Sequence, residues 1–246
     1  MEKNKKPIYI FGPCSIDTRE NLFKIADKLS SLGVKYLRGG AFKPRTSPYS
    51  FKGLNLAGLK ILKETATKYN MLTVSEILDV RNLDLFNKYV DVIQIGARNM
   101  QNFTLLNELG KTDKKIIIKR GFMSTIEELL YAVEYIVNSG NENILICERG
   151  IRTFVQSSRF SLDITSIPVL KDKTDYPIIV DPSHSTGYFK WVSNISYSAI
   201  AAGADGLMLE THITPWSSLS DSSQIVNLEE TEKIINKSNE IYKIVR

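Results

Sequence analysis

Short apolar runs recur along the chain at intervals of about 20 to 40 residues, and longer stretches with a helical period separate them. The runs are almost continuously apolar rather than alternating, which is typical of parallel strands that are buried on both faces of a sheet. We predict strands at residues 8–11, 34–37, 72–74, 92–95, 116–118, 144–147, 178–180 and 207–209.

Helical patterns occupy the segments between these runs. We predict helices at residues 20–32, 54–69, 80–89, 103–109, 126–138, 191–202 and 228–242, with a short helix at 162–166. Thr125 and Glu128 have the spacing of a capping box, which supports a helix start at that point.

Eight strand–helix units follow one another in 246 residues without a linker or a low-complexity stretch. This pattern predicts an α/β fold, a (β/α)8 TIM barrel, with a single catalytic domain over residues 1–246. The alternative is a doubly wound open sheet. That fold usually needs fewer strands and would be expected to show a glycine-rich nucleotide-binding turn, which this sequence lacks.

A charged or reactive residue follows each predicted strand within a few positions. These residues are Cys14, Arg38, Glu76, Arg98, Lys119, Arg149, His184 and Glu210. In a TIM barrel the carboxyl ends of all the strands meet at one mouth, where active sites are built. Requirements of stability alone would scatter such groups over both ends of the barrel, so the pattern predicts an active site at the mouth.

The segment 37–50 concentrates positive charge. Arg38, Lys43 and Arg45 lie within eight residues, beside two glycines and several hydroxyl groups and without an acidic residue. Arginine binds planar oxyanions through paired hydrogen bonds, and glycine lets the backbone approach a ligand. We therefore favour an anion site over a solvated basic loop.

Six cations are expected to face the same mouth: Arg38, Lys43, Arg45, Arg98, Lys119 and Arg149. They would repel one another in a partly dry cleft unless anions bind there. The substrates should therefore carry two phosphates, or a phosphate and a carboxylate. Glu76 and Glu148 are predicted to hold guanidinium planes in place.

A second group combines a thiol, an imidazole and two carboxylates, namely Cys14, His184, Glu210 and Asp221. Each member has an ordinary alternative role, because such a cysteine is most often inert, a histidine can be structural and an aspartate can cap a turn. Their expected convergence at the mouth supports a site for a divalent first-row metal ion. His212 is a reserve candidate, and Cys147 is predicted to be core.

Composition limits the function further. The net charge is +5, but the lysines are spread along the chain and no basic tract is interleaved with aromatic residues, so we expect no nucleic-acid binding. The apolar segment near the N-terminus is too short for a signal peptide or a membrane span, so no membrane association is expected. Two cysteines form no disulfide framework. We expect a cytoplasmic enzyme.

Six segments, in order along the chain, resemble 3-deoxy-D-arabino-heptulosonate 7-phosphate (DAHP) synthase. They are 12–15 (Gly-Pro-Cys-Ser), 37–50, 95–99 (Ile-Gly-Ala-Arg-Asn), 119–122 (Lys-Arg-Gly-Phe), 147–154 and 180–184 (Val-Asp-Pro-Ser-His). The resemblance covers almost the whole chain. The run Lys-Pro-Arg-Thr-Ser at 43–47 is specific, since the sister enzyme, 3-deoxy-D-manno-octulosonate 8-phosphate synthase, has a Lys-Ala-Asn-Arg type of sequence there.

The resemblance implies a metal-dependent, aldol-type condensation of phosphoenolpyruvate (PEP) with erythrose 4-phosphate, the first step of the shikimate pathway. Carried over residue by residue, the metal ligands fall on Cys14, His184, Glu210 and Asp221. The PEP contacts fall on Arg38, Glu76, Gly96, Ala97, Arg98, Lys119 and Arg149. The erythrose 4-phosphate contacts fall on Lys43, Pro44, Arg45 and Thr46.

The resemblance also implies roles. Lys43 is expected to stabilise or protonate the developing alkoxide, and either Glu76 or a metal-bound water to activate the attacking water; Lys119 and His184 complete the predicted catalytic set. Manganese is the first choice of metal, with iron, cobalt or zinc as alternatives. We expect a homo-oligomer, a dimer or a tetramer, and a short form without a regulatory domain.

Two departures from the family pattern touch the loop that carries Asp221. Residues 210–215 read Glu-Thr-His-Ile-Thr-Pro where the family types compared read Glu-Val-His-Pro, and Ser222 replaces the usual glycine. The alternative functions are octulosonate 8-phosphate synthesis from arabinose 5-phosphate, a Schiff-base aldolase with Lys119 as the nucleophile, and a non-catalytic barrel that binds sugar phosphates or nucleic acid.

Overall fold

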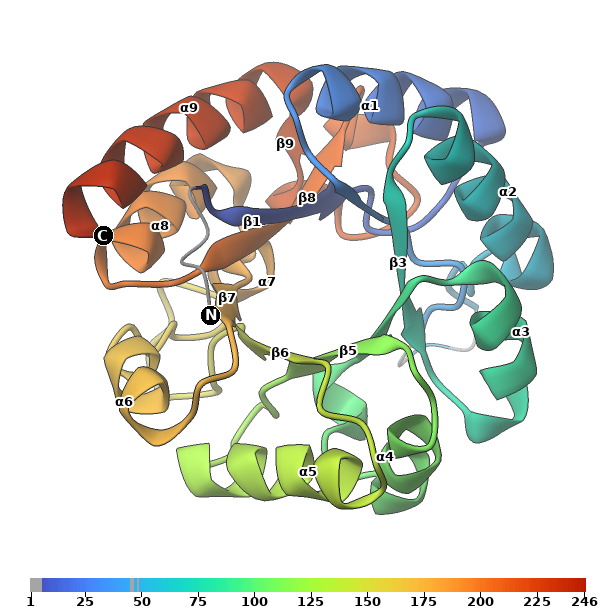
Figure 1. Cartoon of the computed structure of the whole chain (residues 1–246). Helices are drawn as coiled ribbons and strands as arrows, with labels where there is room; N and C mark the ends of the chain where they lie inside the picture. Colours follow the sequence, from blue (N-terminus) through green and yellow to red (C-terminus); the bar gives the residue numbers. More distant parts are fainter. Residues whose placement is uncertain (1–5, 45–46, 48) are drawn as a thin grey trace.

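A closed ring of parallel strands surrounded by helices forms the molecule (Figure 1). The computed structural model describes residues 6–44, 47 and 49–246. The strands of the ring are β1 (Ile8–Gly12), β2 (Tyr36–Arg38), β3 (Leu72–Ile77), β4 (Val92–Ile95), β5 (Lys115–Lys119), β6 (Ile144–Glu148), β7 (Ile178–Val180) and β8 (Gly206–His212). Each pairs with the next in parallel and β8 pairs with β1, which closes the barrel; the short β9 (Val226–Asn227) adds to β8. The predicted TIM barrel is confirmed.

Helices follow the strands around the outside of the ring. They are α1 (Arg19–Ser31), α2 (Asn55–Lys68), α3 (Leu83–Tyr89), α4 (Phe103–Gly110), α5 (Ile126–Asn138), α6 (Ser166–Lys173), α7 (Pro182–Thr186), α8 (Phe189–Ala201) and α9 (Leu228–Val245). The predicted range 126–138 coincides with α5, whose capping box is formed: Thr125 Oγ1 accepts from the Glu128 amide and the Glu128 carboxylate accepts from the Thr125 amide.

Two hydrophobic layers account for the continuous apolar runs. One set of strand side chains fills the barrel interior, and it consists of Ile10, Val74, Val92, Ile117, Leu145, Cys147, Ile179 and Met208. The alternate side chains of the strands face outward and pack against the helices in a larger cluster. Because strand side chains alternate between these two layers, both sets of positions must be apolar. Cys147 is a core residue, as predicted.

Several predicted boundaries differ from the structure, two of them for a clear physical reason. The second strand begins at Tyr36 rather than at residue 34, because the Val34 amide donates to the Leu29 carbonyl, 3.0 Å away, and so belongs to the end of α1. The predicted helix 80–89 is divided into a 3-10 turn (Val80–Asn82) and α3.

The helix predicted at 162–166 is wrong. A pair of backbone hydrogen bonds between Ile151 and Ser161 closes the preceding loop as a hairpin, and α6 begins only at Ser166. Pro168 lies in the first turn of α6, where an amide hydrogen is not needed, so the proline is compatible with the start of the helix.

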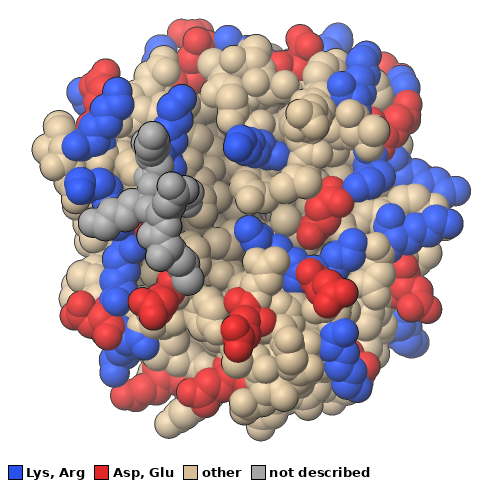
Figure 2. All heavy atoms as spheres, in the orientation of Figure 1, with Lys and Arg blue, Asp and Glu red and all other residues tan. Residues whose placement is uncertain are grey.

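The charged side chains on the face drawn in Figure 2 are of both signs. Among the described residues on this face, lysine and arginine are mixed with aspartate and glutamate, and they form no single extended basic surface. Among the described residues, none of the helices is both long and apolar enough to cross a membrane.

Candidate active site

Glu210 is the buried carboxylate at the centre of the mouth. It lies on β8 opposite Gly12 of β1, and its side chain is fully buried. Arg38 Nη1 donates to Glu210 Oε1 at 2.8 Å, and Gln224 Nε2 donates to Glu210 Oε2 at 2.6 Å. Burial would raise the pKa of Glu210, but its interactions with His184 and with the Arg38 cation outweigh burial and hold it well below its usual range. Glu210 is therefore an anion.

Cys14 reaches the same place from the exit of β1. Gly12, at φ 151°, allows this path, because a Cβ there would lie 2.0 Å from the Arg38 carbonyl oxygen. Cys14 Sγ donates to Asp221 Oδ2 at 3.2 Å, and Lys43 Nζ lies 3.1 Å from Sγ. Burial raises the pKa of Cys14 to about 12, so the thiol keeps its proton without a bound cation.

Cys14, Glu210 and Asp221 form a cluster whose ligand atoms lie within 4.8 Å of one another. Ligand atoms that share one ion at about 2.0 to 2.3 Å lie at most about 4.5 Å apart, so only small side-chain shifts are needed for these residues to hold a single divalent metal ion. Asp221 adopts a left-handed conformation (φ 50°) that turns its carboxylate toward Cys14. Such strain in a non-glycine residue is typical of functional sites.

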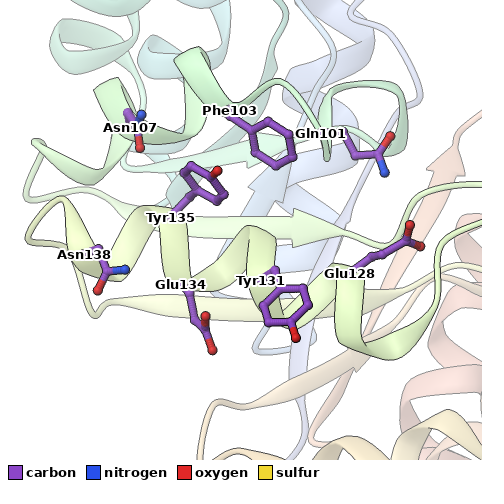
Figure 3. Close-up of a pocket in the computed structure, with 8 residues that line it drawn as sticks. All are labelled: Gln101, Phe103, Asn107, Glu128, Tyr131, Glu134, Tyr135 and Asn138. Atoms are coloured by element: carbon purple, nitrogen blue, oxygen red, sulfur yellow. The ribbon is translucent and has the colours of Figure 1, made fainter.

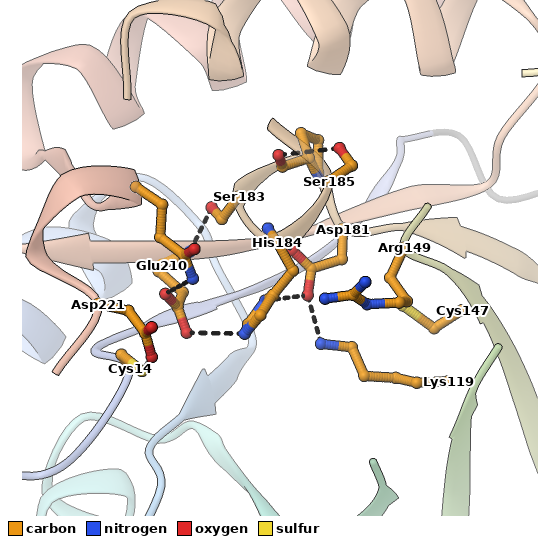
Figure 4. A network of polar contacts seen from close by, with 12 residues as sticks. Cys14, Lys119, Cys147, Arg149, Asp181, Ser183, His184, Ser185, Glu210 and Asp221 are labelled. Atoms are coloured by element: carbon orange, nitrogen blue, oxygen red, sulfur yellow. Dashed lines mark hydrogen bonds and ion pairs between the residues drawn. The ribbon is translucent and has the colours of Figure 1, made fainter. Parts of the chain in front are cut away.

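His184 lies beside this cluster with its ring between two carboxylates (Figure 4). Nε2 is 3.5 Å from Glu210 Oε1, and Nδ1 is 2.7 Å from Asp181 Oδ2. Burial lowers the pKa of His184, which favours the neutral ring. With Nδ1 donating to Asp181, the lone pair of Nε2 faces the cluster, as in many metal-binding histidines. The thiol, imidazole and carboxylate donors predicted from the sequence are thus brought together.

Asp181 is a functional candidate that the sequence prediction missed. It accepts hydrogen bonds from the His184 ring, from the His184 amide at 2.9 Å and from Lys119 Nζ. Burial would raise the pKa of Asp181, but its interactions with His184 and with the Lys119 cation hold it well below its usual range. Asp181 also caps α7, with Pro182 as the first helical residue. The sequence Asp181-Pro182, which is typical of a helix start, was the signal from which a role of Asp181 could have been predicted.

The predicted substrate-binding residues that the structure describes lie at the strand exits of the same mouth. Arg38 and Lys119 are buried and paired with Glu210 and Asp181. Gly96 is in contact with Glu76, because a Cβ at Gly96 would lie 1.9 Å from Glu76 Oε1. Ala97 is adjacent, at the exit of β4, and Pro44 follows Lys43. Arg45 and Thr46 lie outside the described residues.

Glu148 has a guanidinium partner, as predicted, but that partner is Arg120 rather than one of the six cations expected at the mouth. That Glu76 holds a guanidinium group stays a prediction, because Arg45 lies outside the described residues. Among the described residues Glu76 forms no ion pair, and Glu148 binds Arg120 Nη1 at 2.8 Å, a guanidinium that the prediction did not include. Glu148 also accepts the backbone amides of Arg149 and Gly150, at 3.0 and 2.7 Å. It therefore orders the backbone at the exit of β6 rather than the side chain of Arg149.

His212, the reserve candidate, has other partners. It is buried, its Nε2 lies 3.1 Å from Asp17 Oδ2, and its Nδ1 accepts the Thr214 amide. These two polar contacts satisfy both ring nitrogens of the buried His212, so its burial is explained without a role at the mouth.

A cavity of about 650 Å³ lies away from the mouth, between α4 and α5 (Figure 3). Its lining residues are Gln101, Phe103, Asn107, Glu128, Tyr131, Glu134, Tyr135 and Asn138. None of the predicted site residues is among them, so its size alone does not make it the active site. A cavity of about 480 Å³, lined in part by Ala97, Arg98 and Phe122, adjoins the mouth instead.

The fold and the mouth together define a TIM-barrel enzyme with its candidate active site at the carboxyl ends of the strands. The family model described as the DAHP synthetase I family matches residues 2–246. A phospho-2-dehydro-3-deoxyheptonate aldolase from Thermotoga maritima is 50% identical over 94% of this chain and 69% of its own. This chain therefore belongs to the DAHP synthetase I family.

Solved structures agree with this membership. The crystal structure of the phospho-2-dehydro-3-deoxyheptonate aldolase (DAHP synthase) from Thermotoga maritima superimposes with a TM-score of 0.96 at 48% identity, over 98% of this chain and 71% of that one. A 2-dehydro-3-deoxyphosphooctonate aldolase from Geobacter sulfurreducens is only 27% identical, over 97% of this chain and 93% of its own. The predicted enzyme class and reaction are thus confirmed, and the octulosonate enzyme is the distant relative.

Proposed function

We propose that the mouth of this barrel condenses PEP with erythrose 4-phosphate and water, with a divalent metal ion held by Cys14, His184, Glu210 and Asp221. The observation that carries the proposal is the cluster of Cys14, Glu210 and Asp221 ligand atoms within 4.8 Å, with Nε2 of His184 beside it. The chemistry that a bound divalent ion supplies is Lewis-acid polarisation of the aldehyde oxygen. Manganese is our first choice.

The cations of the mouth position the two substrates. Arg98, Lys119 and Arg149 bind the phosphate and carboxylate of PEP, and Arg45 and Thr46 bind the phosphate of the aldose. This arrangement holds C3 of PEP against the aldehyde carbon, and such positioning can lower a barrier by roughly 7–11 kcal/mol. The new carbon–carbon bond leaves an alkoxide.

Lys43 protonates or stabilises that alkoxide. Its Nζ lies 3.1 Å from both the sulfur and the carbonyl oxygen of Cys14, so the ammonium group is next to the cluster. Burial would lower the pKa of Lys43, but the neighbouring Cys14 and Glu210 raise it, which favours the ammonium form that can donate a proton. Water then adds at C2 and phosphate leaves, with Glu76 as the candidate base.

A coupled assay tests the proposal. PEP and erythrose 4-phosphate should be consumed together, activity should be lost after metal stripping with a chelator, and Mn²⁺ should restore it. Full activity in the stripped protein would contradict the metal role. Arabinose 5-phosphate should be a poor acceptor. A Schiff-base mechanism predicts covalent trapping with borohydride; the ion pair of Lys119 with Asp181 argues against it.

We also propose that the protein acts in the cytoplasm as a homo-oligomer, a dimer or a tetramer. The absence, among the described residues, of a helix suited to a membrane span is compatible with this location. Light scattering on the purified protein and fractionation of the source cells test the two statements separately.

A further inference from the structure

The cations of the mouth are held in two different ways. Arg38 is paired with Glu210, and Lys119 with Asp181. In contrast, among the residues the structure describes, Arg98 and Arg149 form no ion pair with a carboxylate. Both instead lie against aromatic rings: the guanidinium carbons of Arg98 and Arg149 are 5.2 and 5.0 Å from the centroid of Phe122.

Phe122 and Phe160 form one stacked pair. Their ring centroids are 5.1 Å apart and their planes differ by 11°. The Arg149 guanidinium carbon lies 3.9 Å from the Phe160 centroid, so this buried cation contacts both rings of the pair. Arginine is attracted to the faces of aromatic rings, and the attraction grows when the site is desolvated.

Backbone hydrogen bonds fix the pair in place. The Arg152 amide donates to the Phe122 carbonyl at 2.6 Å, which joins the loops after β6 and β5. The Phe160 amide donates to the Ser185 carbonyl at 2.9 Å, which joins the pair to α7, the helix of His184. These hydrogen bonds therefore connect the two aromatic residues to the backbone of α7, which carries the candidate metal ligand His184.

An aromatic ring and a carboxylate can both fix the position of a guanidinium group, but only the carboxylate compensates its positive charge. A carboxylate neutralises the cation and competes with an incoming anion for its N–H groups, whereas a ring contacts the face and leaves the N–H edge available. Arg120 illustrates the first case: it is buried between Glu148 and Asp163, at 2.8 and 3.0 Å, and serves the fold. Arg149 is buried without a carboxylate partner, and its Nη1 donates to the Gly150 carbonyl at 3.3 Å. Burial lowers the pKa of Arg149 to about 10, so the group is still a cation at neutral pH, and no carboxylate compensates its charge.

We propose that Phe122 and Phe160 are positioning residues for PEP, which hold Arg98 and Arg149 in the binding orientation without neutralising them. This inference rests on the proposed function, because it assigns Arg98 and Arg149 to PEP. The rings touch no reacting atom. They act through the two guanidinium groups, on the affinity for the PEP phosphate and carboxylate.

Leucine at position 122 tests the proposal, because it keeps apolar bulk but removes the ring. We expect Phe122→Leu to raise the KM for PEP roughly 2- to 30-fold, the range that cation–π contacts support. The kcat and the KM for erythrose 4-phosphate should change less than about twofold. Phe122→Tyr, which keeps the ring, should return the KM for PEP to within about twofold of the parent value. If the leucine variant does not fold, Phe122→Met is the second aliphatic substitution.

Phe23→Leu is the matched control. Its ring also lies under two cations, with the Arg19 guanidinium carbon at 4.1 Å and Lys68 Nζ at 4.9 Å, but it is on α1, outside the mouth. The control should leave the KM for PEP unchanged. A KM for PEP that is unaltered in Phe122→Leu, or equally raised in Phe122→Tyr, would overturn the proposal in favour of simple packing.

Calorimetric titration with PEP separates this inference from the proposed function. If the parent protein binds PEP but does not turn it over with erythrose 4-phosphate, the proposed function fails, and weaker PEP binding by Phe122→Leu still supports the positioning role. Equal PEP affinity of the parent protein and Phe122→Leu would overturn the positioning role, whatever the turnover.

Discussion

The Nδ1 atom of His184 lies 2.7 Å from Oδ2 of Asp181, three residues earlier, and the same carboxylate receives Lys119. One buried aspartate thus orients a candidate metal ligand and a candidate substrate-binding lysine. Its removal should affect both halves of the mouth.

We predict that Asp181→Asn weakens metal binding about 10- to 100-fold, because the amide no longer selects the ring form with the lone pair on Nε2. Metal affinity is measured by competition with a chelator of known affinity. Asp163→Asn is the control, since Asp163 pairs with Arg120 at 3.0 Å and belongs to another network. Equal metal affinity of Asp181→Asn and the parent protein would contradict the assigned role.

The two buried thiols should respond differently to alanine. Cys14→Ala should abolish stoichiometric metal binding and turnover, because Cys14 is one of the three clustered donors. Cys147→Ala should keep the metal and lose stability by about 1 kcal/mol, because Cys147 fills the barrel interior. Elemental analysis and thermal unfolding measure the two effects. Retention of metal by Cys14→Ala would exclude this thiol as a ligand.

Gly96→Ala should destabilise the protein by about 1–3 kcal/mol, because the new Cβ would lie 1.9 Å from Glu76 Oε1 and must displace that carboxylate. Denaturant unfolding measures the change. The double variant Gly96→Ala/Glu76→Ala removes the clash, so alanine at 96 should cost less in that background than alone. Equal costs in both backgrounds would show that the contact with Glu76 is not the cause.

Asp91 should make stability depend on pH. Its carboxylate accepts the Thr73 amide at 2.9 Å and Lys63 Nζ at 2.8 Å. Burial would raise the pKa of Asp91, but these hydrogen bonds lower it in the folded state. The stabilisation is therefore present above the unfolded pKa of about 3.9 and is lost as the pH falls through the lower folded value.

Asp91→Asn should accordingly lower the free energy of unfolding at pH 7 by about 1 kcal/mol, a value reduced for the partial exposure of the pair. The difference from the parent protein should shrink below about pH 4. Denaturant unfolding at a series of pH values tests this, with the exposed Asp172→Asn as the control. A difference that stays constant down to pH 2 would contradict the assignment.

Local signals allowed much of the fold to be predicted. The α5 boundaries followed from a capping box and a regular helical period, both of which are encoded within a few residues. The start of β2 and the start of α6 were placed wrongly for a related reason. At both points the deciding contacts are backbone hydrogen bonds, of Val34 to Leu29 and between Ile151 and Ser161, which side-chain patterns do not indicate.

The sequence predicted which strand-exit residues make up the candidate site, but it did not predict which of these residues form hydrogen bonds or ion pairs with one another. Cys14 and Asp221, or Arg38 and Glu210, are brought into hydrogen-bond contact from distant parts of the sequence. Asp181, Gln224 and the ring of Phe160 acquire their candidate roles only through such contacts.

By itself the sequence determined the α/β period, the barrel and the convergence of ionisable residues on one mouth, because burial on two faces and strand direction impose these features on any chain with this pattern. Only the tertiary structure decided which arginine has its charge compensated by carboxylates. Arg120 meets two carboxylates whereas Arg149 meets two aromatic rings, although both are buried arginines that follow a strand. The physical reason is that charge compensation depends on distances of a few ångströms between side chains. Those distances are defined only when the pairing of β1 with β8 closes the barrel and brings all the strand ends together.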